Sequence, residues 1–142
     1  MGRRQAREVA LEVLFQIDLC HSSVEDALSF AIANAGSEDK GLACKAIDYA
    51  EHLVNGTLQH LKEIDALLEA KSQGWTLARM ATVDRNLLRI AAFEMIFSEE
   101  NIDVGIAINE AVEIAKQYSS SDSSRYVNGV LDALAKEYVK RK

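Results

Sequence analysis

No proline interrupts the 142 residues of this chain. Proline breaks helix interiors because it has no backbone N–H to donate and because its ring clashes with the preceding turn. Apolar residues make up 49% of the chain, and β-branched residues are scattered rather than gathered in runs. This composition favours helices over strands and a packed core over disorder. We therefore expect an all-α fold in a single domain, since the length suits one main core.

Apolar residues recur every three or four positions along most of the chain, which is the spacing of one helix face. The pattern predicts helices over about 4–20, 24–34, 38–70, 82–97, 104–118 and 123–140. Residues 75–80 form either a short helical turn or a tight connector, so the expected bundle has about six to seven helices. Residues 87–97 are apolar on nearly all sides, so we expect this helix to be central and buried all round.

Short polar side chains mark the expected helix starts. Ser23 can cap the helix at 24, Asp103 the helix at 104 and Asp122 the last helix. Each side-chain oxygen can accept a hydrogen bond from a first-turn amide that has no partner inside the helix. These caps support the predicted boundaries.

Two weak points divide the chain. Asn55-Gly56 lies inside the long helix at 38–70, which can kink there. Ser72-Gln73-Gly74 ends that helix. We therefore expect an N-terminal subdomain of about 1–73 and a C-terminal subdomain of about 74–142 within the single domain.

The net charge is −6, which excludes a protein that binds nucleic acid over its whole surface. Basic residues nevertheless gather near both ends of the chain: Arg3, Arg4 and Arg7, then Lys136, Lys140, Arg141 and Lys142. A local basic patch on an acidic protein can bind phosphate, because the field depends on how charge is distributed. The alternative is a solubilising arm at the start and a complement to the helix dipole at the end.

The cysteines and histidines form no pattern that would hold a metal. Cys20 and Cys44 are too few for a disulfide framework and indicate free thiols in a reducing compartment. His21, His52 and His60 lie apart, and neither a glycine-rich phosphate loop nor a nucleophile elbow is present. We expect no enzymatic activity, no metal and no cofactor. With no signal core and no membrane-spanning run, the sequence predicts a cytoplasmic protein.

Four consecutive residues at the start of the last expected helix combine hydroxyl donors, a cation and an aromatic ring: Ser123, Ser124, Arg125 and Tyr126. These groups are the ingredients of single-stranded nucleic-acid binding, and the free amides of a first helical turn attract an anion. The alternative is a serine-rich cap in which Tyr126 is half buried.

The helix at 104–118 carries Asn109 and Lys116 on one flank, seven residues apart. Lys116 could face the same ligand, whereas a helical asparagine such as Asn109 more commonly bonds a neighbouring backbone group. Gly129 in the middle of the last helix costs about 1 kcal/mol relative to alanine. We interpret Gly129 as allowing a close helix–helix approach, and Asn109 and Asn128 as serving packing and positioning.

Four motifs, in this order and with these gaps, resemble the bacterial NusB family along nearly the whole chain. They are Arg3-Arg4-x-Ala6-Arg7-Glu8 with Leu14-Phe15-Gln16, Val83-Asp84-Arg85-Asn86-Leu87-Leu88-Arg89-Ile90-Ala91 with Phe93-Glu94, Ala107-Ile108-Asn109-Glu110-Ala111-Val112-Glu113-Ile114-Ala115-Lys116, and Tyr126-Val127-Asn128-Gly129-Val130-Leu131-Asp132.

The resemblance implies an all-α fold of two three-helix bundles sharing a core. It also implies an antitermination factor that binds the single-stranded boxA element of ribosomal RNA transcripts together with NusE, a small-subunit ribosomal protein. Such a factor helps RNA polymerase resist termination. Some members of the family are dimers and others monomers, so a homodimer stays open.

By the same resemblance, the arginine-rich arm and the first helix contact phosphates, and the segment 122–126 faces the RNA. The candidate RNA-binding residues are Arg3, Arg4, Arg7, Phe15, Arg79, Asp84, Lys116, Asp122, Ser123, Ser124, Arg125 and Tyr126. The alternative function is a helical protein-interaction module with no RNA role, in which the arginine patch meets an acidic partner.

Overall fold

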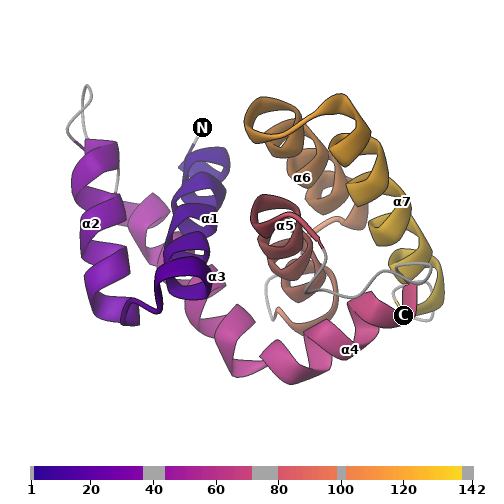
Figure 1. Ribbon diagram of the computed structural model, residues 1–142, viewed down its shortest axis with the longest axis horizontal. Helices are drawn as coiled ribbons and strands as arrows, with labels where there is room; N and C mark the ends of the chain where they lie inside the picture. Colours follow the sequence, from indigo (N-terminus) through magenta and orange to yellow (C-terminus); the bar gives the residue numbers. More distant parts are fainter. Residues whose placement is uncertain (1, 37–43, 72–79, 99–101, 139–142) are drawn as a thin grey trace. The chain divides into compact units, whose positions relative to one another are not determined.

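The computed structural model describes residues 2–36, 44–71, 80–98 and 102–138, and every regular element within these ranges is a helix (Figure 1). The elements are α1 (Gly2–Cys20), α2 (Val24–Gly36), α3 (Cys44–Gln59), α4 (Leu61–Lys71), α5 (Thr82–Ala92), the π-helical segment η2 (Phe93–Phe97), α6 (Val104–Tyr118) and α7 (Ser121–Tyr138). The expected all-α fold class is confirmed. No helix in these ranges is long and apolar enough to cross a lipid bilayer.

The chain divides into two compact units, Met1–Asn55 and Gly56–Lys142, and the division falls inside α3. This boundary differs from the one predicted near residue 73. The physical reason is that α4 packs against α5 and α7, which both follow residue 74. An ion pair between Lys71 and Glu137 also ties the end of α4 to α7. The placing of both units in one domain stays a prediction.

In the first unit, α1 packs along α2 (Figure 1). The buried face of α1 has the predicted helical spacing: Ala6, Val9, Ala10, Val13 and Leu14. The helix ends where His21 takes a φ of 60° and its amide donates to the carbonyl of Ile17 at 3.0 Å. Ser23 Oγ then accepts from the Asp26 amide at 3.1 Å, which confirms the predicted cap of α2.

In the second unit, α5 is the central helix, because it contacts α4, α6 and α7. Leu87, Leu88 and Ile90 are buried along it, as expected from the apolar segment at 87–97. The α-helix was predicted to continue to Phe97, but it ends at Ala92 and the last turn widens into η2.

The predicted single helix over 38–70 is interrupted at His60, not at Asn55-Gly56; residues 38–43 lie outside the described ranges. The His60 ring stacks on Phe93 and Phe97, with centroids 6.2 and 4.5 Å apart. Gly56 stays helical and serves a different purpose. A Cβ there would lie 2.1 Å from Cζ of Phe93, so only glycine lets this ring pack against α3.

A polar network joins α4 to α5. The guanidinium of Arg89 donates from Nε and Nη2 to the two carboxylate oxygens of Asp65 at 2.9 and 3.0 Å. Its Nη1 donates to Oδ1 of Asn86 at 3.0 Å, and the buried Asn86 donates in turn to the carbonyl of Thr82. This two-point pairing fixes the direction of the arginine as well as its distance.

Candidate nucleic-acid interface

The basic start of α1 is organised around a tyrosine of α3. The guanidinium carbons of Arg3 and Arg7 lie 4.2 and 5.8 Å from the centroid of the Tyr49 ring. Residues four apart share a helix face, and a cation over an aromatic face is attracted by the ring quadrupole. Tyr49 was not among the predicted site residues, because its position in the sequence looks like an ordinary core position.

The predicted residues of the first unit differ in their access to solvent. Arg3 is exposed, whereas Arg7 is only 4% exposed. Arg4 and Phe15 are partly exposed. Arg3 is therefore the arginine of this patch that can most readily meet a phosphate, and Arg7 is held against Tyr49.

In the second unit, the start of α7 is capped differently from the prediction. Ser120 Oγ accepts from the Ser123 amide at 3.0 Å, and the Ser120 carbonyl accepts from the Ser124 amide. Asp122, the predicted cap, lies inside the first turn and pairs with Arg125 at 2.7 Å. The serine one residue ahead of the helix is in the geometry that a cap requires, so it takes the role.

The other predicted residues of this segment are unequal. Arg125 is highly exposed, with 78% of its side chain accessible. Ser123 and Tyr126 are partly exposed, and Ser124 is only 4% exposed. The half-buried Tyr126 is compatible with both interpretations of the sequence, since a ring can contact a base with one face while its other side packs.

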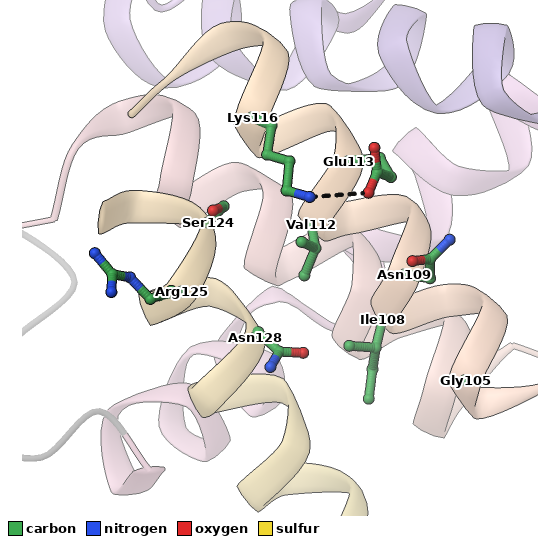
Figure 2. A pocket seen from close by; sticks show the side chains of 9 residues that line it. All are labelled: Gly105, Ile108, Asn109, Val112, Glu113, Lys116, Ser124, Arg125 and Asn128. Carbon is green, nitrogen blue, oxygen red and sulfur yellow. Dashed lines mark hydrogen bonds and ion pairs between the residues drawn. The ribbon is translucent and has the colours of Figure 1, made fainter. Parts of the chain in front are cut away.

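An open groove of about 420 Å³ lies between α6 and α7 (Figure 2). It is lined by Gly105, Ile108, Asn109, Val112, Glu113 and Lys116 of α6 and by Ser124, Arg125 and Asn128 of α7. Three predicted RNA-binding residues, Lys116, Ser124 and Arg125, therefore meet at one feature. Lys116 pairs with Glu113 at 3.3 Å, and its side chain is 57% exposed.

The structure corrects the packing role given to Asn109, Asn128 and Gly129. Both asparagines are exposed and line the groove. Gly129 is exposed as well, and a Cβ at this position would meet nothing within 4 Å among the described residues. Helical spacing alone cannot distinguish a flank that packs from a flank that faces solvent, and this ambiguity caused the error.

Asp103 does cap α6 as predicted, since its Oδ1 accepts from the Gly105 amide at 2.7 Å.

Two further residues, Asp84 and Arg79, were also predicted to bind RNA. Asp84 lies in the first turn of α5, is only 6% exposed, and its Oδ1 has no hydrogen-bond partner in the part of the chain that the structure describes. A carboxylate at a helix start is favoured by the helix dipole. Arg79 lies outside the described ranges, as do residues 75–79 of the segment predicted over 75–80. Across residues 2–36, 44–71, 80–98 and 102–138, no three His, Cys, Asp or Glu side chains gather as a metal site would require.

Comparison with known proteins supplies a family. A model of the NusB family matches residues 4–136. The transcription antitermination protein NusB of Desulforamulus reducens (strain ATCC BAA-1160 / DSM 100696 / MI-1) is 46% identical over 134 residues, covering 94% of this chain and 90% of that protein. A chain of the crystal structure of antitermination factors NusB and NusE in complex with dsRNA superposes with a TM-score of 0.85 at 29% identity, covering 96% of this chain and 98% of that one. A chain of the crystal structure of a plectonemic RNA supercoil superposes with a TM-score of 0.89 at 30% identity, covering 100% of this chain and 99% of that one.

Proposed function

We propose that this chain, which belongs to the NusB family, is a transcription antitermination factor. It binds single-stranded boxA RNA of ribosomal RNA transcripts together with NusE. Within the RNA polymerase antitermination complex, the bound pair helps the polymerase resist termination. The protein acts in the cytoplasm, by binding rather than by catalysis.

The observation that carries the proposal is the groove between α6 and α7. Lys116, Ser124 and Arg125 were selected from the sequence as RNA contacts, and all three line it. The side chains of Lys116 and Arg125 are exposed, and two such cations can hold a phosphate backbone, whereas Ser124 is largely buried. The likeness of the chain over nearly its full length to an antitermination protein, and to chains crystallised with RNA, supports the same ligand.

Aromatic rings favour a single-stranded ligand. Tyr126 on α7 and Phe15 on α1 are partly exposed, and an exposed ring can stack on an unpaired base. A base inside a duplex is already stacked and offers only its edges. One relative was crystallised with double-stranded RNA, so strand preference is a property to measure.

The test is a titration of labelled boxA-type RNA, in single-stranded form and as a duplex of the same sequence, with and without NusE. We expect the single strand to bind more tightly and NusE to strengthen the complex. If no RNA binds at low salt with NusE present, the proposal fails. NusE binding without RNA binding would favour the protein-interaction module instead.

A further inference from the structure

The groove between α6 and α7 contains two amides that phosphate binding does not require. We propose that it receives one unpaired base of a single-stranded RNA, and that Asn109 and Asn128 hydrogen-bond the edge of that base. This inference rests on the proposed RNA-binding function and adds base recognition to backbone contact.

The groove suits a base in size and in surface. Its volume of about 420 Å³ falls within the range of about 300–1,000 Å³ typical of small-molecule sites. Ile108 and Val112 line it from α6, opposite Asn128 on α7 (Figure 2). These apolar side chains can contact the flat face of a base. Because the groove is open, a base could enter while the attached sugar and phosphate stay outside.

The polar groups fit a base edge better than a phosphate. Each asparagine amide carries both an acceptor oxygen and donor N–H groups, and base edges present donors and acceptors side by side. A phosphate only accepts hydrogen bonds. Glu113 also lines the groove, and its carboxylate would repel a phosphate there but could accept from a base amino group.

The cations stand where the RNA backbone would pass. Lys116 and Arg125 both line the groove, and each pairs with a carboxylate three residues before it in its own helix, Glu113 at 3.3 Å and Asp122 at 2.7 Å. Exposed ion pairs of this kind are weak. A phosphate can therefore replace a carboxylate at small cost, while the pairs hold the cations near the groove until RNA arrives.

Within the described residues, no hydrogen bond of the Asn109 or Asn128 side chain holds the fold together. Both are exposed in helices, and asparagine is a poorer helix former than alanine. Residues that lower helix stability without adding packing contacts are expected at positions that bind a ligand. Replacing either asparagine with alanine should therefore stabilise the fold and weaken RNA binding.

The test measures affinity by fluorescence anisotropy for a boxA-type single-stranded RNA and for a series in which one nucleotide at a time lacks its base. We compare the wild-type chain with Asn109→Ala and Asn128→Ala. Each variant should bind the intact RNA about 5- to 150-fold more weakly, because a good pair of base contacts contributes that much discrimination. For the wild type, loss of the base at one position should lower the affinity for RNA by a similar factor. For the variants the same loss should matter much less, because removing the base and removing the asparagine eliminate the same contact.

Gln117→Ala is the matched control, because Gln117 is an exposed amide of α6 that does not line the groove. It should bind like the wild type. The asparagine variants should melt at or above the wild-type temperature, and their salt dependence should be unchanged because no cation is lost.

The results separate this inference from the proposed function. A wild-type chain that binds no RNA overturns both. A wild-type chain that binds RNA, with asparagine variants that match Gln117→Ala or with abasic effects that are the same in all proteins, overturns only the base site. Loss of NusE binding with RNA binding intact would assign the groove to the protein partner and also overturns it.

Discussion

Two helical glycines show how differently one residue type can be used. At Gly56 the space of a side chain is filled by the Phe93 ring, whose Cζ and Cε1 would lie 2.1 and 2.3 Å from a Cβ. At Gly129 the same space is open, with nothing within 4 Å among the described residues. Packing requires the first glycine, whereas the second only makes α7 less stable.

Alanine at these two positions should therefore change stability in opposite directions. Gly129→Ala should raise the free energy of unfolding by about 0.5–1 kcal/mol, because alanine loses less backbone entropy in a helix. Gly56→Ala should lower it by about 1–3 kcal/mol, because a buried ring must move. Urea denaturation of both variants measures the two effects. A destabilised Gly129→Ala would mean that something covers this face of α7.

Tyr126 offers a second prediction at a single side chain. If its ring stacks on a base, Tyr126→Ala should weaken RNA binding by about 1–3 kcal/mol. Tyr126→Phe keeps the ring and should bind nearly as well as the wild type. Isothermal titration of both variants, with circular dichroism to verify folding, measures the difference. A folded Tyr126→Ala with unchanged affinity would place the ring in the core.

For single residues, the sequence shows which side chains could bind RNA, but it does not show which way each side chain points. Arg125 was identified because it stands among serines and an aromatic ring at a helix start, and Lys116 because it shares a helix flank with Asn109; both line the groove. Asn128 and Glu113 line it too, but nothing in their spacing separates them from an ordinary helix flank. Tyr49 was missed because a tyrosine on a core face gives no sign that arginines of another helix will lie on its ring.

Helix extents were predicted well where apolar spacing and a cap coincide. The bounds of α6 match the expected 104–118, and Asp103 caps it as expected. The break at His60 and the π-helical segment at Phe93–Phe97 were not predicted. Both involve the stacking of His60 on Phe93 and Phe97, which lie more than thirty positions further along the chain. The residues near His60 therefore contain no local pattern that predicts either feature.

The start of α7 can be tested as an element. Ser120→Ala removes the oxygen that accepts from the Ser123 amide and should lower stability by about 0.5–2 kcal/mol. Asp122→Ala should cost less, because that side chain is exposed and its ion pair with Arg125 lies at the surface. Ser120→Asp retains a capping oxygen and should behave like the wild type. Thermal melts of the three variants measure these effects. If Asp122→Ala lowered the melting temperature more than Ser120→Ala, Ser120 would not be the cap of α7.

The protein as a whole carries a negative charge that repels RNA, whereas local clusters of basic residues attract it. The net charge of −6 opposes RNA at a distance, so binding depends on a few phosphate contacts. With about four contacts at about −0.7 each, log affinity against log salt should have a slope near −3. Arg125→Gln should make the slope shallower by about 0.7. Anisotropy titrations over a range of salt measure it, and weaker binding at an unchanged slope would make Arg125 structural.

The division into units is also a property of the whole molecule, and the sequence predicted it in a different place. Ser72-Gln73-Gly74 is the most conspicuous interruption of the helical pattern, yet α4 packs with the helices that follow it. Apolar periodicity shows that a helix has a buried face but not which helix covers that face. The partners of α4, including Glu137 and Arg89, lie far along the chain and leave no mark near residue 70.

A boundary inside α3 has a practical consequence for dissecting the protein. Because the helix runs unbroken from Cys44 to Gln59 through the division at Asn55 and Gly56, no loop offers a place to separate the halves. A fragment cut there would end in a helix missing its last turn, and its counterpart would begin with amides that have lost their carbonyl acceptors. A fragment cut near residue 73 would carry α4 away from the two helices that bury it. The contributions of residues in the two units are therefore better tested by point substitutions than by truncation.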